Sequence, residues 1–317
     1  MIKVRSLKYV IYGVSDVEKT KAYMVDFGLT HVPWPNDPNR AYMRGALGSP
    51  YIYIAEESKN PSMRVIGIEL FDAQDLLLAS RIDGASPIRD LDRPGGGKCV
   101  EIVIPGGTKL ELVHGIQETS EHEIRRPLLI NEGLKKSRLN TPQRPERIPA
   151  QVLRLGHVAF CISDPVETRQ WLERHLGMVL SDAMLVPGSK DEYIGFFMRW
   201  NHGAAPTDHH TFLLAKAKTA HVHHCSFELQ DIDAVYMGHE WMKFKEHRHH
   251  WGVGRHVLGS QVFDYWWDPD GFRVERYADG DLFDNTVRAT TVQGTNEQLW
   301  TWGPSVPESF FQEARYI

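Results

Sequence analysis

Several features are scarce in this sequence, and each scarcity excludes a class of protein. Only three cysteines occur in 317 residues, and no two form a Cys-x-x-Cys pair, which argues against a disulfide framework. No window holds about 18 uninterrupted apolar residues. The start MIKVRSLKYVIYGVSD lacks the basic and apolar regions of a signal peptide. We therefore expect a cytoplasmic protein with no membrane partner.

Runs of like charge are also missing. The formal net charge is -5, the sequence pI is about 6.3, and acidic and basic residues are interspersed. This balance argues against nucleic acid as a partner. The length and the 42% hydrophobic content are sufficient for a large core and for two domains.

Histidine, in contrast, is abundant and unevenly placed. Thirteen of the 16 histidines lie between His157 and His256. Because imidazole serves as a metal ligand and as an acid or base near neutral pH, we expect the chemistry to lie in this part of the chain.

An internal repeat divides the chain into two similar halves. YVIYGVSDVEKTKAYMVDFGL from Tyr9 aligns with HVAFCISDPVETRQWLERHLGM from His157, and VIGIELFDAQDL from Val65 aligns with HCSFELQDIDAV from His224. Each segment reads as a strand followed by a helix, and strand pairs with a glycine turn follow, around Glu111 and Glu275. Each half therefore contains two modules that open with a strand and a helix and continue in strands.

The domain boundary is predicted near Pro149, giving domains of residues 1–149 and 150–317. Residues 114–149 are rich in charge and proline and have a weak helical pattern, which favours a linker with a surface helix. The tail after Asp281 has no repeat partner, and its aromatic residues suggest packing over a domain or subunit face.

A metal site is predicted from the differences between the halves. His157 aligns with Tyr9 and His224 with Val65, while Glu275 aligns with Glu111. Two imidazoles and one carboxylate from three strands form the facial triad expected for non-haem iron(II), which leaves positions for substrate and O2. We expect the second half to hold the metal and the first to support structure or assembly.

The segment GRHVLGSQVFDYWWDPDGFRVERYADGD from Gly254 resembles the type I extradiol dioxygenases of the vicinal oxygen chelate superfamily, and the likeness extends over nearly the whole chain. The resemblance implies an α+β fold of four βαβββ modules that form two similar domains, each a mixed-sheet pseudo-barrel. It implies ring cleavage of a catechol-type or trihydroxylated substrate, with Fe(II) or Mn(II) as the metal, O2 as co-substrate and a dimer or tetramer.

The same resemblance assigns roles to further residues. It places proton transfer at His210 in the segment DHHTFLLA, with His209 facing away, and substrate hydrogen bonds at His256 and Tyr265. We also expect three aromatic residues in the substrate pocket wall: Phe197, Trp200 and Trp267.

The remaining histidines have simpler expected roles. Lys and Arg alternate with histidines in HEWMKFKEHRHHWGVGRH, so a solvated connecting helix is expected there rather than a second metal site. This interpretation covers His239, His247, His249 and His250. We expect His202, His221 and His223 to have no role in the site either.

Two alternatives remain open. An enzyme similar to 4-hydroxyphenylpyruvate dioxygenase would use the same ligands on iron with a keto-acid substrate. A non-catalytic module that sequesters an aromatic molecule would be distinguished by a metal assay and by O2 consumption with a catechol.

Overall fold

The computed structural model describes residues 2–312, and within them the order of elements repeats four times. The first module comprises β1 (Val4–Val14), α1 (Val17–Phe27), β2 (Thr30–Val32), β3 (Arg40–Arg44) and β4 (Tyr53–Glu57). The second comprises β5 (Ser62–Leu70), α2 (Ala73–Ala79), β6 (Arg89–Asp90), β7 (Lys98–Val103) and β8 (Lys109–His114).

The second half repeats this order and adds short elements. Its first module comprises β9 (Val152–Ile162), α3 (Pro165–Leu176), β10 (Met178–Leu185), β11 (Tyr193–Trp200) and β13 (Phe212–Lys216). Its second comprises β14 (His221–Leu229), α4 (Ile232–Phe244), β15 (His249–Arg255), β16 (Val262–Trp267) and β17 (Arg273–Ala278). The additions are β12 (Thr207–Asp208), β18 (Leu282–Phe283), β19 (Thr290–Gln293), η1 (Asn296–Gln298) and η2 (Glu308–Phe311).

Each of the four α-helices begins in the same way. The residue before the helix is an aspartate whose side chain accepts a hydrogen bond from the backbone N–H three residues later. This cap satisfies one of the backbone donors that a helix start leaves unpaired. The four capping residues are Asp16, Asp72, Asp164 and Asp231. The helices that the repeat predicts after the strands at Tyr9 and His157 are thus present.

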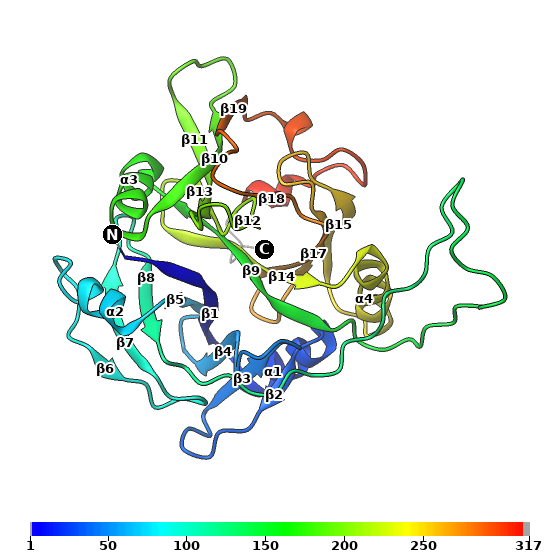
Figure 1. The fold of residues 1–317 in the computed structure, drawn as a ribbon, viewed down its shortest axis with the longest axis horizontal. Coiled ribbons are helices and arrows are strands. Elements are labelled where there is room, and N and C mark those ends of the chain that lie inside the picture. The colour runs from blue at the N-terminus through cyan, green and yellow to red at the C-terminus, as the bar shows by residue number, and fades with distance from the viewer. Residues whose placement is uncertain (1, 313–317) are drawn as a thin grey trace.

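Each half forms one large mixed sheet, which confirms the predicted α+β fold with two similar domains. The strand order is β2-β3-β4-β1-β5-β8-β7-β6 in the first half. In the second it is β15-β16-β17-β14-β9-β13-β11-β10-β19, the same order read in reverse with β19 added at one edge. Figure 1 shows the two sheets side by side, in blue to cyan and in green to red.

The register confirms the alignment inferred from the repeat. In the first domain Tyr9 lies opposite Gly67, which pairs on its other side with Glu111. In the second domain His157 lies opposite Ser226, which pairs with Glu275. The predicted ligands therefore occupy the centre of their sheet.

The two domains share one apolar core. The largest cluster of buried side chains contains residues of both halves. At the contact, the rings of Phe27 and Phe227 meet edge to face at 5.7 Å, and the guanidinium of Arg276 lies 4.3 Å from the Phe27 ring. A backbone hydrogen bond of 2.8 Å from Ala46 to Val152 also crosses the boundary.

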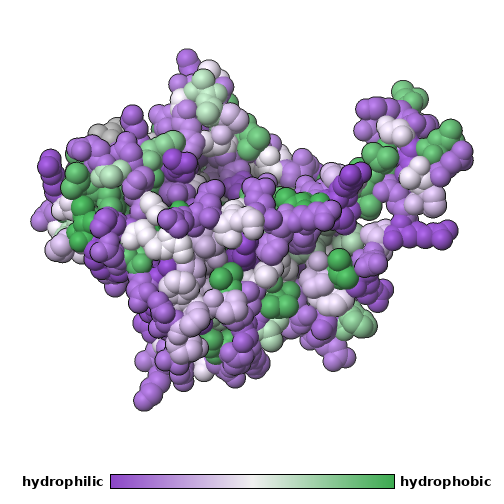
Figure 2. Space-filling view, turned by 60° about the horizontal axis from the view of Figure 1, so that its bottom comes forward, coloured by the Kyte–Doolittle hydropathy of each residue, from purple (hydrophilic) through white to green (hydrophobic). Residues whose placement is uncertain are grey.

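The segment between β8 and β9 contains no helix within the described residues, so the predicted surface helix is wrong. Residues 124–148, which we call the arm, extend away from the rest of the molecule (Figures 1 and 2). Without a surface to pack against, the weak apolar pattern there does not stabilise a helix. The division at residue 149 lies in this segment and stays a prediction.

Candidate metal centre and its cavity

Three polar side chains meet at the centre of the second sheet: His157 in β9, His224 in β14 and Glu275 in β17. The Nε2 atoms of the two histidines are 3.2 Å apart. Glu275 Oε2 lies 2.9 Å from His157 Nε2 and 3.4 Å from His224 Nε2. All three side chains are buried. The structure thus brings together the three predicted ligands.

This arrangement fits a divalent cation. Both carboxylate oxygens of Glu275 are buried without a hydrogen-bond partner among the described residues, which is costly for an unpaired charge. Three donors placed about 2.1 Å from one ion and at right angles would lie about 3.0 Å apart. The observed distances are close to this value. Two imidazoles and one carboxylate leave positions open, as in non-haem iron(II) sites.

The environment sets the protonation states that such an ion requires. Burial lowers the pKa of His224 to about 3, although the Glu275 carboxylate opposes the shift, so the imidazole is neutral. Burial raises the pKa of Glu275, but the facing His157 imidazole, followed by His256 and His224, outweighs burial and holds that pKa well below its ordinary value, so the carboxylate is ionised. Neutral imidazole and ionised carboxylate are the forms that bind metals.

His223 orients the ligand that follows it. Its Nε2 lies 2.8 Å from the carbonyl oxygen of Phe310, so this nitrogen donates the hydrogen. Burial, followed by the nearby charge of Arg273, lowers the pKa of His223 well below its ordinary value and keeps the ring neutral. Its Nδ1 then accepts from His224 Nδ1 at 2.7 Å, which leaves the lone pair of His224 on Nε2, facing the other ligands.

His256 and Tyr265 form a second pair beside the ligands. His256 Nδ1 lies 2.6 Å from the carbonyl oxygen of Leu299, and its Nε2 lies 3.0 Å from the Tyr265 hydroxyl. Its Nε2 is also 3.6 Å from Glu275 Oε1. Burial, followed by the Glu275 charge, raises the pKa of Tyr265 well above its ordinary value, so the phenol keeps its proton.

His210 faces the same space. Its ring centroid lies 4.3 Å from that of His157 and 4.9 Å from that of Phe197. Burial, followed by the neighbouring His157 and His209, lowers the pKa of His210 well below its ordinary value. A neutral imidazole beside the metal centre can accept a proton.

A cavity of about 410 Å³ connects these groups. Its walls include His157, His210, His224, His256 and Tyr265, and most of its other lining side chains are apolar. The tail after Asp281 closes one side of the cavity, with contributions from both η1 and η2.

The three aromatic residues predicted for the pocket wall lie in different places. Phe197 lines the cavity, whereas Trp200 and Trp267 do not. Trp200 is three positions from Phe197 on β11, and an odd separation puts it on the opposite face of the strand. Trp267 shares the face of Tyr265 but lies two residues farther along β16. Its ring centroid is 4.3 Å from that of His250, and the Arg273 guanidinium lies over it.

Two histidine expectations are wrong, because His221 and His223 line the cavity. His209 faces away from the cavity, as expected, and is bonded to His210. The signal that sequence reasoning missed is the doublet: each of the pairs 209–210 and 223–224 has a cavity residue preceded by a histidine that bonds it. His202 bonds the backbone oxygen of Val4 across the domain boundary.

The predicted solvated helix ends at Phe244, so the later histidines of that segment lie outside it. His239 Nδ1 and His249 Nε2 lie 3.0 and 2.9 Å from the same oxygen of buried Asp264. This trio is compact enough to surround an ion. However, the second oxygen of Asp264 already accepts from the Trp266 indole at 2.5 Å, and the Arg276 guanidinium lies 3.9 Å away. Hydrogen bonds and one fixed cation thus balance this carboxylate.

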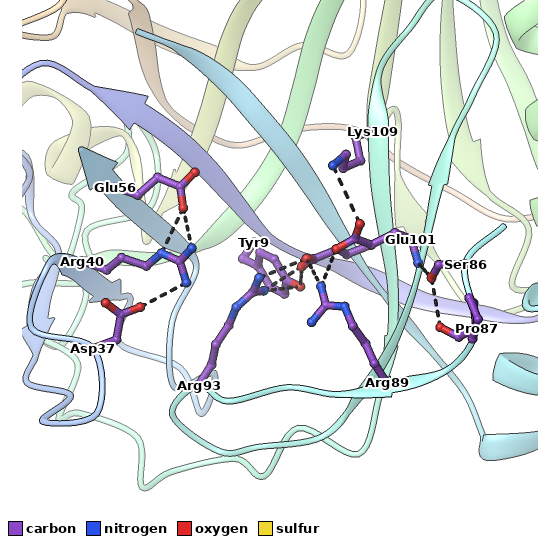
Figure 3. A network of polar contacts seen from close by, with 11 residues as sticks. Tyr9, Asp37, Arg40, Glu56, Ser86, Pro87, Arg89, Arg93, Glu101 and Lys109 are labelled. Carbon is purple, nitrogen blue, oxygen red and sulfur yellow. Dashed lines mark hydrogen bonds and ion pairs between the residues drawn. The ribbon is translucent and has the colours of Figure 1, made fainter. Parts of the chain in front are cut away.

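In the first domain, the glutamate equivalent to Glu275 is Glu111, and an arginine side chain lies beside it. Arg93 makes two hydrogen bonds to Glu111, of 2.7 and 3.0 Å, and the Tyr9 hydroxyl also donates to this carboxylate. Figure 3 shows Arg93 and Arg89 converging beside Tyr9. A guanidinium therefore neutralises the buried glutamate where the second domain has two histidines.

Comparisons with known proteins agree with this description. Residues 154–275, which include all three predicted ligands, match the Glyoxalase/Bleomycin resistance protein/Dioxygenase superfamily. The chain is 32% identical over 158 residues to metapyrocatechase 2 of Cupriavidus necator; the match covers 50% of this chain and 46% of that protein. The chain thus aligns with about half the length of this relative.

Solved structures share the fold over nearly the whole chain. Homoprotocatechuate 2,3-dioxygenase of Brevibacterium fuscum, in complex with 3,4-dihydroxyphenylacetate, has a TM-score of 0.80 at 18% identity, covering 99% of this chain and 93% of that one. The Mn(II)-bound glyoxalase of Novosphingobium aromaticivorans has a TM-score of 0.76 at 21% identity, covering 99% of both chains. The 2,3-dioxygenase LapB of Pseudomonas sp. KL28 has a TM-score of 0.76 at 19% identity, covering 92% and 98%. The fold is therefore the vicinal oxygen chelate fold predicted from the sequence. Among the described residues, no helix has the length and apolarity to span a membrane.

Proposed function

We propose that this protein is an iron(II)-dependent extradiol dioxygenase that cleaves the ring of an aromatic diol or triol with O2. The observation that carries the proposal is one cavity in which His157 and His224, next to buried Glu275, face three groups able to move or share protons: His210, His256 and Tyr265. The partial match to metapyrocatechase 2 supports it.

The residues around the centre have complementary tasks. When bound, the ion would supply a redox-active Lewis acid with open coordination positions. His210 is neutral and accepts the proton of a substrate hydroxyl. Tyr265 keeps its phenol proton and can donate it to a substrate oxygen, and His256, 3.0 Å from the Tyr265 hydroxyl, lies beside the same position. Leu299 and Phe310 of the tail hold water away from the reacting atoms.

The cavity also supports a substrate class. No arginine lines it among the described residues, and its one lysine, Lys216, is 45% exposed and paired with Glu192 at 3.1 Å. Apolar side chains such as Met184, Ile194 and Leu213 line the wall instead. We propose an uncharged substituent on the ring, which also disfavours a keto acid as substrate.

Iron rather than manganese is part of the proposal, although the same donor set suits both ions. We also propose a cytoplasmic location, which is supported by three buried cysteines that form no disulfide. A homo-oligomer is the proposed assembly, with the arm as its contact.

Anaerobic loading of metal-free protein with Fe(II) or Mn(II), followed by O2 uptake, tests the proposal. We expect one ion per chain, O2 consumption with 4-methylcatechol, and a yellow ring-cleavage product. Catalytic efficiency with 3,4-dihydroxyphenylacetate should be at least about tenfold lower, since one unpaired buried charge costs more than 1.4 kcal/mol. Glu275→Gln should lose both metal and turnover.

The outcomes separate the alternatives. Tight catechol binding with one bound ion and no O2 uptake would contradict an oxygenase and favour a binding module. Turnover of 4-hydroxyphenylpyruvate but of no diol would favour the keto-acid enzyme.

A further inference from the structure

A chain of buried polar groups runs from His210 away from the cavity. His210 Nδ1 lies 3.0 Å from His209 Nδ1, and His209 Nε2 lies 2.6 Å from Oδ2 of Asp182. The three residues are 4%, 2% and 5% exposed. Only His210 lines the cavity, so the other two can influence a bound substrate only through it.

The chemistry of the three groups determines where the ring hydrogens lie. A carboxylate only accepts hydrogen bonds, so the hydrogen between Asp182 and His209 belongs to His209 Nε2. A neutral His209 then has a lone pair on Nδ1, and the hydrogen between the two rings belongs to His210 Nδ1. The Nε2 of His210, on the ring edge away from His209, therefore carries a lone pair. This is the form that a general base requires.

We propose that Asp182 and His209 are positioning residues that fix His210 in the tautomer with a free Nε2. The catalytic meaning of this inference rests on the proposed dioxygenase function, whereas the tautomer is a property of the folded protein. When a substrate O–H bond breaks and the N–H bond forms at Nε2, His210 gains a positive charge. The hydrogen bond through His209 to the Asp182 carboxylate stabilises that charge.

Neighbouring residues surround these three groups. The Thr290 hydroxyl, from β19, donates to the other oxygen of Asp182, so both carboxylate oxygens have a donor. The Ser181 hydroxyl donates to the backbone oxygen of His209 at 2.5 Å. Gly259 lies against the rings, since a Cβ there would be 3.1 Å from His209 Nδ1. The pair is thus enclosed from several sides.

Asp182→Asn tests the proposal. The amide carbonyl would accept from the Thr290 hydroxyl and its NH2 would donate to His209 Nε2, which reverses every hydrogen in the chain and puts a hydrogen on His210 Nε2. We expect kcat to fall at least 100-fold with KM and metal content within about threefold of wild type, because general base catalysis contributes about 10²–10⁴. Long-range ¹⁵N–¹H spectra of zinc-loaded protein should show His210 as the Nδ1–H form in wild type and the Nε2–H form in the variant.

Thr290→Val is the matched control, because it removes a hydrogen bond from the same carboxylate and leaves the charge. It should keep kcat within about threefold and keep the wild-type tautomer. An Nε2–H form of His210 in wild type would overturn the proposal even if the variant does not fold. An Asp182→Asn protein with wild-type turnover would also overturn it. If wild type turns over no diol, the dioxygenase proposal fails, and the spectra still decide the tautomer.

Discussion

At the scale of single residues, Glu111 and Glu275 show two ways of balancing the charge of a buried carboxylate. Both carboxylates are buried at equivalent positions of the two sheets. Glu275 has no hydrogen-bond partner among the described residues, and the donor set around it fits a divalent ion. Glu111 is bonded to Arg93, Arg89 and Tyr9. The first domain has a permanent cation where the second offers a binding site for one.

Arg93→Met should therefore destabilise the protein by about 3 kcal/mol at neutral pH, because it leaves a buried carboxylate short of its main partner. Burial raises the pKa of Glu111, but Arg93 outweighs it and holds the pKa below the ordinary value of 4.5. A depressed folded pKa gives stability above the unfolded pKa that is lost as the pH falls. The difference between variant and wild type should thus shrink below about pH 4. Urea unfolding between pH 3 and 7 measures it.

Arg89→Met is the control for this prediction. Arg89 contacts the same carboxylate at 3.0 Å but is 43% exposed, so we expect a loss below about 1 kcal/mol. Equal losses for the two variants would show that Arg93 has no special role.

The sequence predicted the ligand positions but not the residues behind them. The alignment of the two halves pairs Tyr9 with His157 and Glu111 with Glu275. The same strand register is present in both domains, so the aligned residues occupy equivalent positions. Whether His209 or His223 turns toward its neighbour depends on partners far away, namely Asp182 and the Phe310 carbonyl. The histidine doublets mark these positions, but the sequence around them does not predict contacts over such separations.

At the scale of elements, the four βα units were predictable because each carries its own start signal. An aspartate cap before an amphipathic segment is local information. The predicted helix near the arm lacked such a cap. The residues lining the cavity were harder to predict than the helices. The alternation of side chains along β16 places Trp267 on the same face as Tyr265, but it does not show where along that face the cavity ends.

The turn between β16 and β17 allows a test of pH dependence. Oδ1 of Asp268 accepts from the backbone N–H groups of Asp270 and Phe272, while its Oδ2 is buried without a partner among the described residues. Burial raises the pKa of Asp268 to about 7. The folded protein thus binds more protons than the unfolded chain between about pH 4 and 7, and stability falls as the pH rises through this window.

Asp268→Asn keeps the accepting oxygen and removes the titration. We expect the variant to gain stability relative to wild type as the pH rises from 4 to 7, by on the order of a few kcal/mol. Thermal unfolding across this range measures the gain. Asp279→Asn, an exposed position on the following loop, should show no such trend. A constant difference at all pH values would contradict the raised pKa.

At the scale of the whole molecule, the tail after β17 contacts polar side chains around the predicted metal site. The carbonyls of Leu299 and Phe310 accept from His256 and His223, and the backbone oxygens of Ser309 and Gln312 accept from buried Arg273. Through His223, the tail orients His224, one of the three proposed metal ligands.

A chain that ends at Val306 should bind its metal about 10–100-fold more weakly, since it lacks the carbonyl that fixes the tautomer of His223. Competition with a chelator measures the affinity. A chain that ends at Gln312 retains every one of these contacts and should bind like wild type. Equal affinities for the two truncations would mean that the tail acts only as a cover.

The arm is the other feature that a single subunit does not explain. It exposes large aliphatic side chains: Leu129, Ile130, Leu134 and Leu139 are each more than half exposed. Figure 2 shows hydrophobic groups, in green, on the projecting arm, apart from the body of the molecule. The arm contains seven lysines and arginines and two glutamates, so its net charge is +5, and the rest of a chain of net charge -5 carries -10. Apolar groups on a basic arm fit the acidic body of a second copy.

Leu134→Asp combined with Leu139→Asp should therefore convert a homo-oligomer into monomers, because the arm would lose apolar contacts and basic character together. Sedimentation velocity at micromolar concentration measures this, and 1 M NaCl should weaken the wild-type assembly, since salt screens the attraction between arm and body. Val103→Asp places the same charge on a 58% exposed site of the body and should leave the assembly intact. A wild-type monomer, or an oligomer that survives both substitutions, would remove the arm from the contact. Turnover of the separated monomers would then show whether each subunit holds a complete site, as the cavity within one chain implies.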